Sequence, residues 1–381
     1  MDFGLTRTLY DTEHEIFRSS VRQFLEAEVL PHYADWEEAG QTPREIWLRA
    51  GEVGLLGTSI PEAYGGSEGG FLYDAVVIEE LGRYGVAAPA WDMHAHIVSP
   101  IIVGFGSEDQ KRDWLPALAA GEKIISIGLT EPDGGSDLKT LRTTAKLDGN
   151  HYVVNGSKTF ITNGIIGDVV LLAVKTAPEL GAKGISLLLV DSHSEGFKKG
   201  RNLKKVGNKA QDTAELFFDD LRVPTTNMIG AENEGWRILW AGLARERMVV
   251  AIRSMAIAEA ALDMTVEYTK QRRAFDQAIF DFQNTQFKLA EMATEIEVGR
   301  PFVDRCIAMV EDGTLSPETA AKAKLWTTEL QGRVVDECVQ LHGGYGYMWE
   351  FPITRLWADS RIHRIYAGTN EIMKYIIGRS L

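Results

Sequence analysis

A lone carboxylate, Glu246, stands in a mostly apolar stretch from Trp236 to Ile257 that has the pattern of one long helix. Positions three and four residues away lie on the same helix face. At Glu246 these positions hold no cation: Gly242, Leu243, Val249 and Val250. A poorly hydrated carboxylate has a raised pKa and is a stronger base. Glu246 is therefore a candidate catalytic base.

A second interpretation fits the same residues. Arg245, Glu246 and Arg247 are consecutive, and such a charge cluster can cap a packing face or bridge to another helix. Buried ion pairs outnumber catalytic carboxylates, so these residues alone favour the structural interpretation. Motifs near the C-terminus reverse that preference.

The 381-residue chain is long enough for two or three domains with a buried core. Its formal net charge of −14 argues against a nucleic-acid-binding surface. Cys306 and Cys338 lie in helical patterns and are expected to be buried thiols of a reducing compartment.

No apolar run approaches the roughly 20 residues of a membrane span, and no leader pattern is seen. A bacterial cytoplasm is the expected location, with a processed form in an organellar matrix as the alternative.

Hydrophobic periodicity divides the chain into three parts. Residues 1–122 and 233–381 show the 3.6-residue period of helices. Residues 123–232 hold short β-branched or apolar runs separated by turns. The sequence therefore predicts a helical domain, a β domain of the sandwich or barrel type, and a helical bundle, in that order.

Local signals add three expectations. Thr12 is expected to cap a first helix that extends from Glu13 to Val29. Asn155-Gly156 predicts a tight hairpin turn between two strands, because glycine tolerates a positive φ. His94 and His96 differ by two positions and would point to different helix faces, so no metal site is predicted.

Three glycine-containing motifs could contact a ligand. Leu129 to Asp137, LTEPDGGSD, combines hydroxyl groups with adjacent glycines that let a ligand approach bare backbone. Phe160 to Gly164, FITNG, places an aromatic ring and a hydroxyl two residues apart, on one side of a regular strand. Leu341 to Tyr347, LHGGYGY, follows a helix and not a strand, so a Rossmann-type site is rejected.

Together with RRAFDQ at Arg272 to Gln277 and IYAGTNEIM at Ile365 to Met373, these motifs resemble those of the acyl-CoA dehydrogenase family. They occur in family order, and the resemblance covers nearly the whole chain. It implies an α+β fold with an N-terminal α-helical domain (1–122), a middle β-barrel domain (123–232) and a C-terminal four-helix bundle (233–381). The periodicities described above agree with this order.

The resemblance also implies that FAD binds between the barrel and the bundle. The residues expected to contact FAD are Leu129, Thr130, Ser136, Phe160, Thr162, Arg272, Phe275, Gln283, Gln340, Gly343, Gly344, Thr369 and Glu371. Those from Arg272 to Gly344 would hold the ribityl, pyrophosphate and adenine parts, in part across a dimer interface. The residues expected beside the substrate are Ser136, Arg247 and Gly368.

The chain departs from the family pattern in three places. Short- and medium-chain members carry the base as Glu in a Tyr-Glu-Gly-Thr motif, whereas this chain has Tyr366-Ala367-Gly368-Thr369. Long-chain and isovaleryl members place it in a motif that resembles Arg245-Glu246-Arg247, so the resemblance assigns the base to Glu246. The backbone N–H of Ala367 would polarise the thioester carbonyl. Phe160 replaces the Trp of many members, and Asp276 replaces a usual Gly, which puts the local turn in question.

The implied reaction is α,β-dehydrogenation of a saturated acyl-CoA thioester to the trans-2-enoyl-CoA, with hydride transfer to flavin N5. An electron-transfer flavoprotein would accept the electrons. A homodimer or homotetramer is expected, with no nucleic acid and no membrane span. Three alternatives stay open: an oxidase or monooxygenase on the same fold, a dehydrogenase of acyl-carrier-protein thioesters, and a flavin-binding scaffold that lost its base at Ala367.

Overall fold

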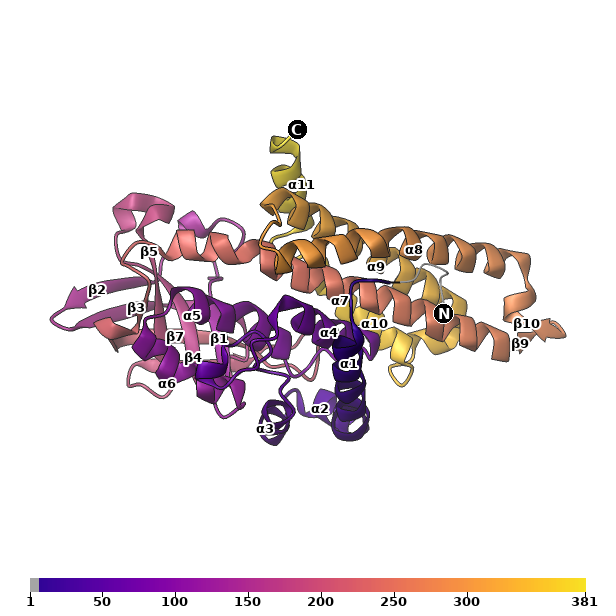
Figure 1. Ribbon diagram of the computed structural model, residues 1–381, viewed down its shortest axis with the longest axis horizontal. Coiled ribbons are helices and arrows are strands. Elements are labelled where there is room, and N and C mark those ends of the chain that lie inside the picture. Colours follow the sequence, from indigo (N-terminus) through magenta and orange to yellow (C-terminus); the bar gives the residue numbers. More distant parts are fainter. Residues whose placement is uncertain (1–6) are drawn as a thin grey trace.

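The computed structural model describes residues 7–381 as an α+β molecule with a β-sheet at one end and long helices that extend to the other (Figure 1). The N-terminal helices pack alongside the junction of these two parts. The predicted order of helical, β and helical regions is confirmed. The helices that precede the sheet are α1 (Thr12–Phe24), α2 (Tyr33–Ala39), α3 (Glu45–Glu52), α4 (Gly70–Arg83), α5 (Ser99–Phe105) and α6 (Glu108–Ala119).

The first helix begins and ends differently from the prediction. Its N-cap is Asp11, not Thr12, because the Asp11 carboxylate accepts hydrogen bonds from the backbone N–H groups of Glu13 (3.0 Å) and His14 (3.1 Å). An Asp side chain at this position satisfies N–H groups that have no partner within the helix. The α-helical geometry ends at Phe24, and a π-helical turn continues from Leu25 to Val29.

The eight strands of the middle region form one sheet with the order β6-β7-β3-β2-β4-β5-β8, and β1 pairs with β4. The strands are β1 (Ile125–Gly128), β2 (Thr144–Asp148), β3 (His151–Thr162), β4 (Val169–Lys175), β5 (Ile185–Asp191), β6 (Phe197–Asn202), β7 (Thr213–Pro224) and β8 (Met228–Ile229). In β4, Val169 and Leu171 face a core shared with α5 and α6, whereas Val170 and Leu172 face a core within the sheet. Burial of both faces explains the uninterrupted apolar run of β4.

The hairpin predicted at Asn155-Gly156 is wrong. Both residues lie inside β3, where the register with β7 shifts between Val154 and Gly156. A β-bulge inserts an extra residue and suits glycine, which explains the misleading signal. The turn between β2 and β3 lies instead at Gly149-Asn150, where Gly149 has a φ of +62° and Asp148 pairs with His151.

The C-terminal part is built on three long helices, α7 (Gly235–Gln271), α8 (Gln283–Glu311) and α9 (Pro317–His342). A short hairpin of β9 (Arg273–Ala274) and β10 (Gln277–Ala278) joins α7 to α8 at the end of the molecule remote from the large sheet (Figure 1). Two shorter helices follow, α10 (Pro352–Ser360) and α11 (Asn370–Arg379). Ser316 caps α9 by accepting a hydrogen bond from the Thr319 N–H at 3.1 Å. Within residues 7–381, no helix is both long and apolar enough to cross a membrane.

Candidate active site

Glu246 is a half-buried carboxylate on α7 that makes no hydrogen bond or ion pair within the described chain. Burial raises its pKa, and the nearby cations Arg247 and Lys324 act in the opposite direction. Val249 and Val250, which share its helix face, are buried. The structure therefore holds a carboxylate that is poorly hydrated and free to accept a proton.

The sequence allowed a structural role for the cluster Arg245-Glu246-Arg247, in which it bridges to another helix. In the structure, Arg245 makes this bridge. Its guanidinium donates to Ser59 Oγ (2.9 Å) and to the His96 carbonyl (3.0 Å), and it pairs with the Asp74 carboxylate. Although burial alone would raise the pKa of Asp74, His96 and Arg245 lower it to about 2. Arg245 thus ties α7 to the N-terminal helices, which leaves Glu246 unpaired.

Arg247, the residue expected beside the substrate, carries a buried charge with little compensation. Its side chain is 3% exposed, and its Nη1 donates weakly to the Pro317 carbonyl at 3.5 Å. Its Nε has no partner in the part of the chain that the structure describes. Burial lowers its pKa. Because an unpaired buried cation is costly, Arg247 has the properties of a residue that completes its hydrogen bonds with a ligand.

The segment that the sequence marked as Tyr366 to Thr369 forms a left-handed turn before α11. Ala367 has a φ of +55° and Gly368 a φ of +82°. Thr369 caps α11 by accepting from the Ile372 N–H at 3.3 Å, and Glu371 lies exposed in the first turn of α11. Tyr366 is 38% exposed. Desolvation raises the pKa of its hydroxyl, and the negative charges that raise it further include Glu246. The charge of Glu246 is thus felt at Tyr366, the residue that precedes the turn.

Lys324 contacts the turn at Gly368 and interacts electrostatically with Glu246, and no sequence motif pointed to it. This α9 side chain is fully buried, and its Nζ donates to the Gly368 carbonyl and to Asn370 Oδ1, both at 2.9 Å. The pKa of Lys324 is lowered to about 8, first by burial and then by Arg247, while Glu246 acts to raise it. The one available signal was a lysine on the buried, small-residue face of a predicted helix.

The residues expected around the flavin ring lie after β1 and near the end of β3, two strands of the large sheet. Leu129 and Thr130, directly after β1, are half-buried, and Ser136 in the following loop is exposed. Thr162 at the end of β3 is half-buried and accepts a hydrogen bond from Gln211 Nε2 at 2.9 Å. Phe160 is 67% exposed.

Phe160 does not lie in a regular strand, as the sequence had suggested. It has a φ of +60° and falls where the register between β3 and β7 shifts, between Lys158 and Ile161. Bulges of this kind re-aim side chains next to active sites. The ring is thus presented by local backbone strain, and simple strand alternation with Thr162 does not hold.

A buried ion pair positions the Leu129–Asp137 loop. Lys158 is fully buried on β3, and its Nζ donates to Glu131 Oε1 (2.8 Å) and to the Leu129 carbonyl (3.1 Å). Glu131 also accepts hydrogen bonds from the backbone N–H groups of Arg142 and Thr143. Sequence reasoning did not identify this pair, which joins residues from separate segments.

The other expected cofactor residues lie at the opposite end of the bundle. Arg272, Phe275 and Gln283 surround the β9–β10 hairpin, and Gln340, Gly343 and Gly344 lie at the end of α9. The two groups are close together, since the Arg272 guanidinium lies 5.7 Å from the centre of the Tyr345 ring. With a rise of about 1.5 Å per residue, Glu246 and Gln271 are roughly 38 Å apart along α7. The structure does not bring this group to Glu246 within one chain.

The residues present fit FAD in three respects. Phe160 and Phe275 are exposed aromatic rings, at 67% and 89%, and can stack against planar groups. Gly343 and Gly344 have open space where a Cβ would stand, so a ligand can approach the backbone directly. Arg272 offers an exposed guanidinium suited to a phosphate.

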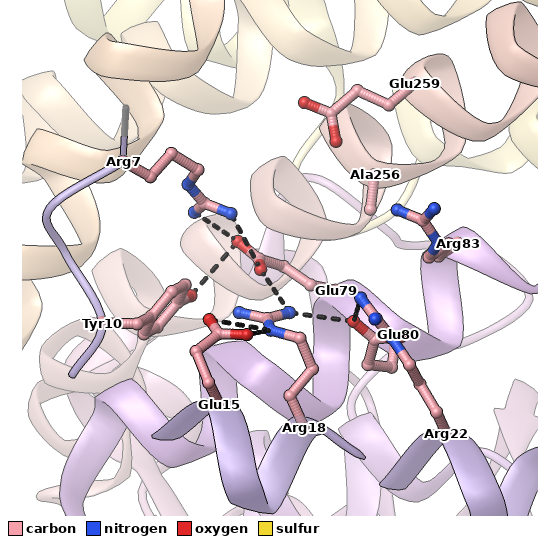
Figure 2. Close-up of a pocket in the computed structure, with 10 residues that line it drawn as sticks. All are labelled: Arg7, Tyr10, Glu15, Arg18, Arg22, Glu79, Glu80, Arg83, Ala256 and Glu259. Carbon is pink, nitrogen blue, oxygen red and sulfur yellow. Dashed lines mark hydrogen bonds and ion pairs between the residues drawn. The ribbon is translucent and has the colours of Figure 1, made fainter. Parts of the chain in front are cut away.

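A cavity of about 360 Å³ between α1, α4 and α7 is a different feature (Figure 2). Its residues form an ion-pair network in which Glu79 accepts from Arg7 (2.8 Å) and Arg18 (2.9 Å). Burial would raise the pKa of Glu79, but Arg7 and Arg300 lower it to about 2. The network joins the N-terminal segment to α4, and Glu246 does not line this cavity.

Comparison with known proteins identifies the family. Models of the N-terminal, middle and C-terminal domains of acyl-CoA dehydrogenase match residues 11–122, 126–221 and 233–381. The chain is 47% identical over its full length to the long-chain specific acyl-CoA dehydrogenase, mitochondrial, of Sus scrofa, and covers 89% of that protein. The crystal structure of an acyl-CoA dehydrogenase from Geobacillus kaustophilus is 48% identical, with a TM-score of 0.96 over 98% of this chain and 99% of that one. An acyl-CoA dehydrogenase complexed with FAD from Bacillus anthracis is 33% identical, with a TM-score of 0.93 over 99% of this chain and 68% of that one.

The chain therefore belongs to the acyl-CoA dehydrogenase family, and it is an oxidoreductase of that family. The resemblance found in the sequence motifs is confirmed, as is the three-part fold that it implied.

Proposed function

We propose that the protein catalyses α,β-dehydrogenation of a saturated acyl-CoA thioester to the trans-2-enoyl-CoA. The observation that carries this proposal is the state of Glu246, a half-buried carboxylate without a partner, with a raised pKa, whose charge is felt at Tyr366 directly before the Ala367–Gly368 turn. Glu246 removes the α-proton, and the β-hydrogen leaves with its electron pair. The thioester thus loses two hydrogens and two electrons.

The turn before α11 supplies the second part of the mechanism. The α C–H is a weak acid, so negative charge on the thioester oxygen must be stabilised in the transition state. The backbone N–H of Ala367 is assigned this role, and Gly368 leaves room beside it. A backbone donor does not depend on the side chain, so the loss of Glu at this position removes a base but leaves a hydrogen-bond donor. Ser136 and Arg247 are assigned to the rest of the substrate.

FAD would supply the acceptor for the β-hydrogen, which leaves as hydride. Leu129, Thr130, Phe160 and Thr162 would hold its ring, with Ser136, Thr369 and Glu371 completing this part of the site. Arg272, Phe275, Gln283, Gln340, Gly343 and Gly344 would hold its remainder. Because these two groups lie at opposite ends of the bundle, the second group would come from another copy of the chain. An electron-transfer flavoprotein is the proposed electron acceptor.

The proposal is tested by anaerobic mixing of the FAD-loaded protein with acyl-CoA. We expect the oxidised-flavin absorbance of the native protein to bleach. Glu246→Gln has nearly the same volume but cannot accept the proton, and loss of a general base lowers such rates by about 10²- to 10⁴-fold. The variant should keep its bound FAD. Undiminished bleaching in Glu246→Gln would remove Glu246 from the role of base.

The same assay separates the alternative reactions and defines the substrate. Release of peroxide in air during turnover would indicate an oxidase. Bleaching by an acyl-carrier-protein thioester and not by acyl-CoA would identify the other carrier. No bleaching with any thioester would contradict the proposed dehydrogenation. A panel of acyl-CoAs of different length and branching sets the acyl preference.

A further inference from the structure

The contacts of Lys324 suggest more than a packing role. Its side chain is fully buried on α9, and both of its acceptors are uncharged: the Gly368 carbonyl and the Asn370 amide oxygen, each at 2.9 Å. No carboxylate of residues 7–381 lies within ion-pair distance of it. A buried ammonium group without a paired anion is costly. A neutral side chain could fill the same space, so the charge itself needs an explanation.

The turn that Lys324 contacts requires external support. Ala367 adopts a φ of +55°, a conformation that residues other than Gly, Asn and Asp seldom adopt. Such backbone persists where the surrounding structure holds it. Lys324 holds the carbonyl of the next residue, Gly368, and one turn further along α9 Thr328 Oγ1 receives a hydrogen bond from Asn370 Nδ2 at 3.0 Å. Lys324 and Thr328 thus form two parts of one clamp on the turn and the start of α11.

The charged groups around Lys324 come from every element packed against it. α7 contributes Glu246 and Arg247, α9 contributes Glu329, α11 contributes Glu371, and His363 lies in the short helix before the turn. Arg247 disfavours the protonated amine, whereas the three carboxylates favour it. The influence is mutual, because Lys324 also opposes the burial-driven rise in the pKa of Glu246.

We propose that Lys324 is a positioning residue: it holds the Gly368 carbonyl so that the Ala367 N–H faces the thioester oxygen. Its buried ammonium group also adds a positive charge to the surroundings of Glu246. This inference rests on the proposed dehydrogenation. It adds a residue on α9 that does not contact the reacting atoms.

The first test uses the pH dependence of flavin bleaching with saturating acyl-CoA, in FAD-loaded protein. The acid limb of this profile reports the protonation of Glu246 in the complex. Lys324→Met and Lys324→Gln both remove the charge, and we expect each to shift the acid limb upward by about one pH unit. Thr328→Val is the matched control, since it removes a hydrogen bond of the same clamp without changing charge, and its acid limb should not move.

The second test measures ligand binding by calorimetry and does not depend on turnover. An enoyl-CoA carries the thioester carbonyl, whereas an alkyl-CoA thioether of the same length lacks it. Lys324→Met should weaken enoyl-CoA binding by about tenfold, the usual effect of one lost hydrogen bond. Its affinity for the thioether should stay unchanged. Lys324→Gln keeps an amide donor on a side chain one atom shorter and should lose less.

The outcomes separate this inference from the proposed function. If native protein bleaches and the acid limbs of both charge-free variants match the native limb, the electrostatic role is contradicted while the dehydrogenation stands. If the variants weaken both ligands equally, Lys324 is only structural. If native protein does not bleach, the proposed function itself fails. Should Lys324→Met fail to bind FAD, Lys324→Gln alone decides the pH test.

Discussion

The side chains of three consecutive residues of α7 make different contacts, because the helix points them in different directions. Each step along an α-helix turns the side chain by about 100°. Arg245 therefore reaches Asp74 on α4, Arg247 points into the bundle beneath Pro317, and Glu246 falls between them without a partner. Asp74 is buried and Glu246 half-buried, yet the pKa of the first is lowered and that of the second raised. Asp74 is paired directly with Arg245 and His96, whereas Glu246 has no ion-pair partner, and this difference decides the direction.

Asp359 on α10 is another carboxyl with a raised pKa, and this pKa makes the stability of the fold depend on pH. Its carboxyl is buried, accepts a hydrogen bond from the Asn208 N–H, and has one oxygen without a partner in the described chain. Burial raises its pKa from 3.8 to about 7. A carboxyl whose folded-state pKa is raised destabilises the fold as it ionises, so its cost is absent below the unfolded pKa and is complete above the folded one.

We therefore predict that Asp359→Asn stabilises the protein in a pH-dependent way. The difference between 3.8 and about 7 corresponds to roughly 4 kcal/mol, the upper limit of the gain expected above pH 7. The gain should fall as the pH is lowered through this range and vanish near the unfolded pKa. Denaturant unfolding of both proteins across the range measures it. A gain that does not vary with pH would show that Asp359 is not the titrating group.

The β9–β10 hairpin shows how a short element tolerates an unusual residue. Ala274 pairs with Gln277, and the two residues between them, Phe275 and Asp276, have φ values of +51° and +67°. Two positive φ values define the turn that fits the twist of a two-residue hairpin. Asp adopts this conformation more readily than most residues. The turn that the missing glycine had put in question does form.

Asp276→Gly should therefore raise the free energy of unfolding, because glycine adopts a positive φ without steric cost. The expected gain is up to about 1 kcal/mol, the usual cost of a left-handed non-glycine residue. Asp276→Ala is the control: it removes the carboxylate but keeps the Cβ, so it should not stabilise. Thermal unfolding compares the three proteins, and equal stabilisation by Ala and Gly would contradict this account of the turn.

At the scale of the whole molecule, the long helices separate the expected cofactor residues into two groups. One group lies near the large sheet, with Phe160 and Thr162, and the other lies by the β9–β10 hairpin and the end of α9 (Figure 1). The roughly 38 Å between Glu246 and Gln271 is longer than one dinucleotide can bridge with contacts at both ends. If both groups hold one FAD, as proposed, its site is formed by two copies of the chain.

Complementation between two inactive variants tests this arrangement. Gly344→Val places a side chain in open space, so it should leave the fold intact but block the backbone from a ligand. Glu246→Gln removes the base. Each variant alone should show little bleaching with acyl-CoA, whereas dimers that contain one chain of each type should regain about half of the native activity, since one of their two sites is intact. Mixtures as inactive as the separate variants would mean that each chain supplies its own complete site.

The sequence alone determined the order of the domains, the family and the candidate base. Helical and strand periods are local properties, and five motifs in a fixed order are a strong joint signal. The missing Glu at Ala367 and the carboxylate at Glu246 could both be read directly from the printed residues. Even so, a local signal failed at Asn155-Gly156, where glycine serves a bulge instead of a turn.

Only the tertiary structure decided which charges are paired. The bonds from Arg245 to Asp74, from Lys158 to Glu131 and from Lys324 to Gly368 join residues that are far apart in the sequence. No local pattern contains such information, because burial and electrostatic coupling depend on which elements pack together. The candidate base could thus be named from the sequence. That it lacks an ion pair, and that Arg247 and Lys324 still lower its pKa, follows from the packing of α7, α9 and the turn before α11.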